Sequence, residues 1–139
     1  MRLGAVLLSL LLAGCGYAAA GTWDDDPANW GRVFGGDKPD SVVVVHSHYW
    51  RSPHFTMEFE YFFEIAKDDE FQARFFRMNE LVRLEGAKAE PRHFGEKPAW
   101  FLPKPLGSYE VWTFAERPQN FRLFIDRETG EIFLTDYQV

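Results

Sequence analysis

Three of the four histidines lie close together in the sequence, at His46, His48 and His54. His46 and His48 are two residues apart in a segment that predicts a β-strand, so both rings project from the same face of that strand. Two imidazoles with a third ligand, such as His54 or a carboxylate of the next strand, match the ligand sets that zinc and copper take. The spacing therefore allows a zinc or copper site. The alternative is that these residues are polar side chains at a strand end, beside the turn at 51–53.

Sequence motifs for catalysis do not accompany these histidines. The chain has no Gly-x-Ser-x-Gly elbow, and Gly35-Gly36 lacks the pattern of a phosphate-binding loop. Ser47 lies between two histidines, but adjacent residues of a strand face opposite ways, so they do not form a triad. Glu58 and Glu60 are expected to be solvated on the polar face of a strand. We therefore expect that the protein is not an enzyme.

The N-terminal residues predict an export signal that ends just before Cys15, the only cysteine. Arg2 supplies a positive charge, and residues 3–12 form an apolar run that is shorter than the roughly 20 residues of a membrane span. A chain with one cysteine forms no intramolecular disulfide, even in an oxidising envelope compartment. The alternative for Cys15 is a buried thiol at the end of a first helix, which Gly14 and Gly16 would weaken.

Residues Leu12-Ala13-Gly14-Cys15 resemble the lipobox of bacterial lipoproteins at all four positions. The resemblance implies that the thiol of Cys15 carries diacylglycerol, that the signal over 1–14 is removed, and that the new amino group is acylated. It also implies an anchor in the bacterial cell envelope. Asp follows the cysteine in lipoproteins of this family that stay in the inner membrane. Here Gly16 follows it, so the resemblance implies the outer membrane, facing the periplasm.

The remaining residues predict a lipidated tether over 15–22 and a single domain over 23–139. The chain is 46% hydrophobic and 26% charged, and it contains 14 Phe, 5 Trp and 5 Tyr, which is enough for a globular core. Its formal net charge of −6 argues against nucleic acid as a partner, because phosphate contacts need clustered lysines and arginines. The expected partners are a membrane, through the lipid, and another envelope protein.

The periodicity of apolar residues predicts an α+β domain with a mainly antiparallel sheet of about five strands, one main helix on one face and a short N-terminal helix. Asp26 suits the N-cap of the short helix, and Pro27 its first position. The predicted order is a helix from 27 to Gly35, strands over 42–50 and 55–65, a helix over 69–84, a loop over 87–107, and strands over 108–115, 121–126 and 131–137.

The last two strands are predicted to form a hairpin with Gly130 in the left-handed region. In this register Leu123 lies opposite Leu134, and Phe124 lies opposite Phe133. The main helix is expected to cover the sheet face that carries Phe59, Tyr61 and Phe63. The short helix is expected to cover part of the other face, with Phe62, Phe124 and Phe133.

Trp100 and Phe101 lie between prolines in the long loop. Aromatic side chains on a stiff loop are good anchors for a protein partner, and the alternative is that both fold back as a lid on the sheet. The layout loosely resembles small bacterial lipoproteins of uncharacterised families, which implies no known activity.

The sequence favours a non-enzymatic envelope lipoprotein that acts as a binding or accessory module. Two roles remain open within that class: an accessory subunit for secretion or assembly, and an immunity-type protein whose acidic surface faces a basic toxin. The alternative function is a metal-binding envelope protein that uses His46, His48 and His54. No cofactor is expected beyond the lipid on Cys15, apart from that zinc or copper.

Overall fold

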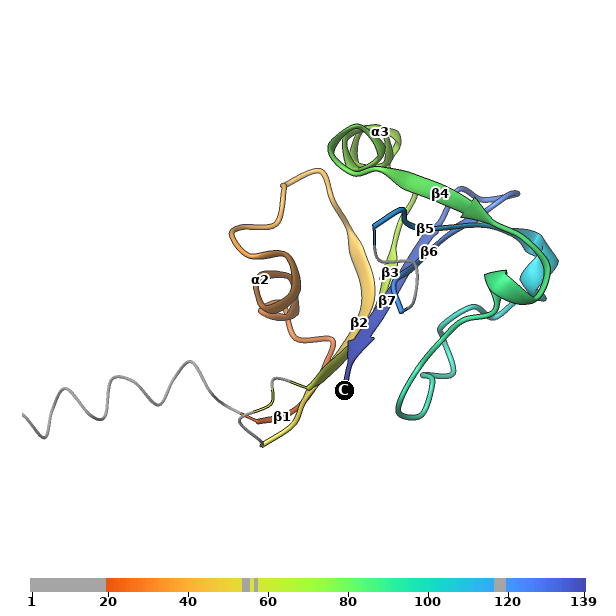
Figure 1. Cartoon of the computed structure of the whole chain (residues 1–139). Helices are drawn as coiled ribbons and strands as arrows, with labels where there is room; N and C mark the ends of the chain where they lie inside the picture. Colours follow the sequence, from red (N-terminus) through yellow and green to blue (C-terminus); the bar gives the residue numbers. More distant parts are fainter. Residues whose placement is uncertain (1–19, 54–55, 57, 117–119) are drawn as a thin grey trace, which may run out of the picture.

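The computed structural model describes residues 20–53, 56, 58–116 and 120–139. They form one antiparallel sheet of seven strands in the order β1-β2-β3-β7-β6-β5-β4 (Figure 1). The strands are β1 (Gly21–Asp24), β2 (Val44–Arg51), β3 (Phe59–Ile65), β4 (Leu81–Leu84), β5 (Tyr109–Phe114), β6 (Arg122–Asp126) and β7 (Ile132–Gln138). The described helices are α2 (Asn29–Phe34), α3 (Asp69–Met78) and two short 3-10 helices, η2 (Gly86–Ala89) and η3 (Leu106–Ser108).

The prediction of about five strands is wrong, because the two edge strands β1 and β4 were missed. Each has four residues, too few for a clear alternation of apolar and polar side chains. Strand β1 begins at Gly21, inside the range expected for the tether, and pairs with β2. Strand β4 pairs with β5, although its residues lie within the range predicted for the main helix, 69–84.

Helix α3 ends at Met78 rather than at residue 84 because Asn79 leaves the helical conformation. The side-chain amide of Asn79 donates to the carbonyl oxygen of Phe75 at 2.8 Å, which satisfies one of the last carbonyls of the helix. Val82 continues the helical spacing of Phe71 and Phe75 in sequence, but it lies on β4. The helix begins at the predicted residue 69, where Asp68 is the N-cap and its Oδ1 accepts from the backbone N–H of Phe71 at 2.8 Å.

The hairpin of β6 and β7 confirms the predicted register. Leu123 pairs with Leu134, and Phe124 pairs with Phe133. Gly130 has a φ of 77°, as the turn requires of a residue without a Cβ. Asp126 Oδ1 accepts from the backbone N–H groups of Glu128 and Thr129, so the side chain of the first turn residue holds the turn closed.

Both helices lie on one face of the sheet, which corrects the expected placement of the short helix. Helix α2 begins at Asn29, two residues after the predicted start, and Trp30 packs against Phe63 with the ring centroids 6.3 Å apart. The segment between β4 and β5 covers the other face instead (Figure 1). A spacing of three and four residues between apolar side chains identifies a helix, but which face of a sheet the helix covers depends on contacts distant in sequence.

The two faces carry two separate apolar clusters. The first joins α2 and α3 to the face with Tyr61, Phe63 and Leu134. The second lies under the long segment over 86–108 and contains Phe62, Phe124 and Phe133.

Candidate functional site

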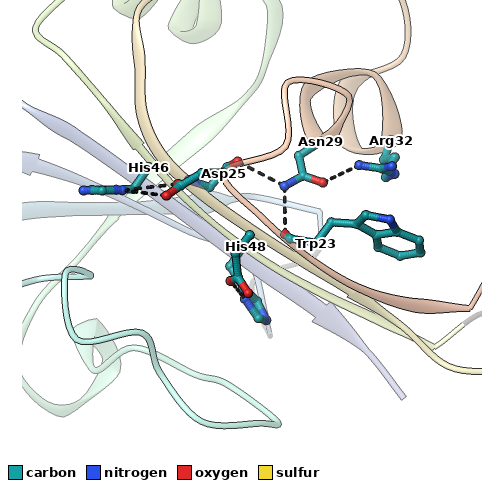
Figure 2. A network of polar contacts seen from close by, with 8 residues as sticks. Trp23, Asp25, Asn29, Arg32, His46 and His48 are labelled. Carbon is teal, nitrogen blue, oxygen red and sulfur yellow. Dashed lines mark hydrogen bonds and ion pairs between the residues drawn. The ribbon is translucent and has the colours of Figure 1, made fainter.

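His46 and His48 project from the same face of β2, and each contacts a different aspartate at the end of β1 (Figure 2). His48 Nδ1 lies 2.6 Å from Oδ1 of Asp24, its partner in the strand register. His46 Nδ1 lies 3.2 Å from Oδ1 of Asp25. A carboxylate at Nδ1 fixes the orientation of an imidazole. The two histidines are thus held separately, and the contacts tie the edge strand β1 to β2.

Ser47 lies between the histidines and points to the opposite face, where it is buried. Its Oγ accepts from Nδ2 of Asn29 at 3.0 Å, and the same amide nitrogen donates to the carbonyl oxygen of Trp23 at 3.0 Å (Figure 2). Oδ1 of Asn29 accepts from Arg32, whose guanidinium lies 4.4 Å from the centroid of the Trp23 ring. This network joins α2 to the first two strands and is structural.

Within the described ranges, no three side chains of the His, Cys, Asp and Glu types are grouped closely enough to hold one metal ion. His54 and Cys15 lie outside the described residues. The metal site of His46, His48 and His54 therefore stays a prediction.

Phe101 is completely buried on the second face of the sheet. Its ring makes edge contacts with Phe62, Phe124 and Phe133 at centroid distances of 4.9, 6.0 and 5.7 Å. Trp100 is half-buried and stacks on His46 at 5.3 Å. Phe101 thus packs on the sheet as in the lid arrangement, and partner binding through Trp100 and Phe101 stays a prediction.

Two polar side chains fasten the loop to the sheet. Glu60 is buried, not solvated as expected, and its carboxylate accepts from the backbone N–H groups of Phe94 and Gly95. Lys104 Nζ lies 2.8 Å from Oδ2 of Asp126, which is itself buried at the hairpin turn. Burial of Asp126 raises the pKa of its carboxyl, but the bonds from Lys104, Thr129 and Glu128 outweigh it, so the net pKa is lowered.

We expect the stability that Asp126 contributes to disappear in acid. Because the pKa of its carboxyl is lower in the folded state, the contribution is present above the usual value of 3.8 and is lost as the pH falls through the lowered value. Asp126→Asn should therefore lower the melting temperature at pH 7, and the gap to the wild type should narrow toward pH 3. Glu128→Gln is the matched control, because this exposed carboxylate also contacts Lys104. A gap that stays constant with pH would contradict the assignment.

An open cleft of about 700 Å³ lies on the first face of the sheet, between α2 and α3. Its floor is formed by strands and its two walls by the helices. The residues lining it are Trp30, Arg32, Val33, Phe34, Gly35, Asp37, Pro39, Tyr49, Arg51, Phe59, Tyr61, Phe71, Arg74, Phe75, Met78, Asn79, Phe114, Phe121, Asp136 and Gln138. Its volume lies within the range of small-molecule sites, about 300–1,000 Å³.

Aromatic rings in mutual contact line much of the cleft. On the α2 side, Phe34 contacts Tyr61 at 6.3 Å, and Tyr61 stacks on Phe59 at 6.2 Å. On the α3 side, Phe75 stacks on Phe121 at 6.0 Å, and Phe121 stacks on Phe114 at 4.1 Å. Rings from strands that are far apart in the sequence therefore line the cleft, beside the polar side chains of Arg51, Asp136 and Gln138.

The cleft remains open because α3 does not pack closely against the sheet. No residue of α3 is buried, although Phe71 and Phe75 pack partly against the first apolar cluster. Met78, at the end of the helix, is 72% exposed and still lines the cleft. The rings thus support α3 at a distance from the strands.

Charged side chains of the cleft favour an anion. The lining contains three arginines and two aspartates, in a chain whose overall charge is −6. Arg32 forms an ion pair with Asp26 at 2.8 Å. Arg74 lies on the cleft side of α3 and has no hydrogen-bond or ion-pair partner among the residues that the structure describes.

Phe71, Phe75 and Met78 form a stripe at helical spacing, and such a stripe predicts a core contact. The same stripe also contains a residue that indicates a ligand site, Arg74. Arg74 is three residues after Phe71 and four before Met78, so it shares their face of the helix. A cation in an otherwise apolar stripe indicates a face that is not fully buried.

The chain matches no protein-family model, and no curated protein or solved structure is significantly similar to it. Among the described residues, none of the helices has the length and hydropathy that crossing a membrane requires.

Proposed function

We propose that the protein is a lipid-anchored binding module of the bacterial cell envelope whose ligand site is the cleft between α2 and α3. In this proposal the signal over 1–14 is removed and acylated Cys15 anchors the chain in the outer membrane, facing the periplasm. The domain binds its ligand without chemical conversion. An accessory role in secretion, assembly or immunity would act through this bound ligand or through a protein partner.

The anchor is supported by the complete lipobox match at residues 12–15. Strand β1 begins at Gly21, so six residues from Cys15 to residue 20 would separate the lipid from the folded domain. Six residues span about 20 Å when fully extended. The domain would therefore lie next to the membrane surface.

The observation that carries the binding function is the cleft itself. Apolar surface is normally removed from water by packing, yet here rings from α2, α3, β2, β3 and β5 line an open volume. An open apolar volume with a few charged groups is the usual form of a small-molecule site.

An aromatic anion tests this site directly. The probe is 1-anilinonaphthalene-8-sulfonate, with a segment over 20–139 whose folding is first checked by circular dichroism and thermal melting. We expect one probe per chain, with enhanced fluorescence. Met78→Glu should weaken binding of the probe about tenfold, because it removes an apolar contact and adds a negative charge that repels the sulfonate. The variant should melt near the wild type, since Met78 is mostly exposed.

Val82→Glu is the matched control, because Val82 is also an exposed apolar side chain but does not line the cleft. It should bind the probe as the wild type does. Equal binding by wild type and Met78→Glu, or no enhancement with the wild type, would rule out the cleft as the binding site.

A further inference from the structure

We propose that the ligand of the cleft is a long-chain fatty acid, bound across the strands with its carboxylate at Arg74. This inference rests on the proposed function, since it names the ligand class of the same site. It is carried by the length of the cleft, the chemistry of its floor and the position of its cations.

The cleft has the length of one acyl chain. Its floor residues come from β2, β3, β7 and β5 and from Phe121 at the start of β6, so the cleft crosses four strand spacings. At about 4.8 Å per spacing this is about 19 Å. An acyl chain that fills one half of a hydrocarbon core of about 30 Å is about 15 Å long. The remaining length accommodates a head group.

The rings of the floor favour a ligand with a long apolar part. The backbone N–H and C=O groups of the central strands are engaged in the ladder, and rings from β2, β3 and β5 line the floor, while β7 contributes Asp136 and Gln138. A peptide lying across these rings would lose hydration of each amide that does not meet a polar side chain of the floor, and each such buried group costs free energy. An acyl chain loses no hydrogen bonds there and buries only apolar surface.

The cations of the cleft favour an acid at one end of that chain. Arg74 lies on α3 among Phe71, Phe75 and Met78, and its guanidinium is exposed at the wall of the cleft. A carboxylate can accept two parallel N–H bonds from a guanidinium, which a neutral alcohol of equal length cannot do. Arg74 therefore distinguishes a fatty acid from other single-chain lipids.

The proposed anchor also indicates where the ligand comes from. Gly21 pairs with Arg51, which lines the cleft, so the tether leaves the domain at one end of the site. A membrane held near that end by acylated Cys15 contains dissolved fatty acids. We therefore infer that the fatty acid enters the cleft from the anchoring membrane.

The test uses the full acylated chain in phosphatidylcholine nanodiscs, with a hexadecanoic acid that carries a photoreactive diazirine near its methyl end. After irradiation, mass spectrometry should locate the label on residues that line the cleft. Unlabelled hexadecanoic acid should compete, and hexadecanol should compete at least fivefold less well. Arg74→Gln should reduce labelling about five- to tenfold at limiting probe, as expected for the loss of one charged contact.

Arg77→Gln is the matched control, since Arg77 is an exposed arginine of the same helix that does not line the cleft. It should label as the wild type does. Label confined to other surfaces, equal competition by hexadecanol, or labelling of the cleft by a diazirine phosphatidylcholine instead of the acid would each overturn the inference. If the sulfonate probe binds in the cleft and the fatty acid does not, only the ligand class is wrong. If neither binds there, the proposed function fails as well.

Discussion

Replacement of Phe101 by alanine is expected to lower the free energy of unfolding by about 3–5 kcal/mol, the range of large aromatic truncations in cores. The ring is completely buried and contacts three other buried rings from β3, β6 and β7. Its removal would leave a cavity at the centre of the second apolar cluster, because the strands beneath it cannot close on the space. Chemical denaturation of the segment over 20–139 measures the change.

Trp100→Ala is the comparison within the same loop. Trp100 is half-buried and stacks on the partly exposed His46, so its loss should cost about 1–2 kcal/mol. Both variants should retain binding of the sulfonate probe while folded, since neither residue lines the cleft. Near-normal stability of Phe101→Ala would contradict the packed lid.

Cys15→Ala is expected to abolish lipid attachment and cleavage before residue 15. The lipobox resemblance makes the thiol the acceptor of the diacylglycerol, and alanine has no nucleophile to replace it. The unmodified precursor should keep residues 1–14. Intact mass and metabolic labelling with a radioactive fatty acid measure both effects.

A double variant, Cys15→Ala with Ala18→Cys, provides the control for this experiment. It retains one cysteine in the chain but moves it out of the motif, and it should remain unlabelled. A wild-type protein that begins at Met1, or that has an unmodified residue 15, would contradict the anchor.

The β6–β7 hairpin was predicted correctly because its information is local. Alternation of apolar side chains sets the faces of each strand, and Gly130 with Asp126 sets the turn between them. The start of α3 was likewise predictable from one capping aspartate. The end of α3 was not, since Val82 satisfies a helical spacing and a strand pairing equally well.

The candidate site could be predicted only in part from the sequence. The histidines lie on one face of a strand as predicted, but the register with β1 places Asp24 beside His48, and Asp25, the next residue, contacts His46. The arginine and the rings of the cleft were visible as residues of a helix and of strands. That this arginine and these rings line one cleft could not be predicted, because they come from elements separated by tens of residues.

By itself the sequence determined the lipobox resemblance, the periodicity of the longer elements and the turn of the hairpin, which all depend on neighbours within a few residues. Only the tertiary structure decided that both helices share one face of the sheet and that the loop with Phe101 covers the other. It also decided that the aromatic side chains of α3 pack only partly against the strands, so that the cleft stays open. The physical reason is that apolar burial is non-directional: a stripe of apolar residues requires a partner surface, but long-range packing selects which surface it meets and how closely.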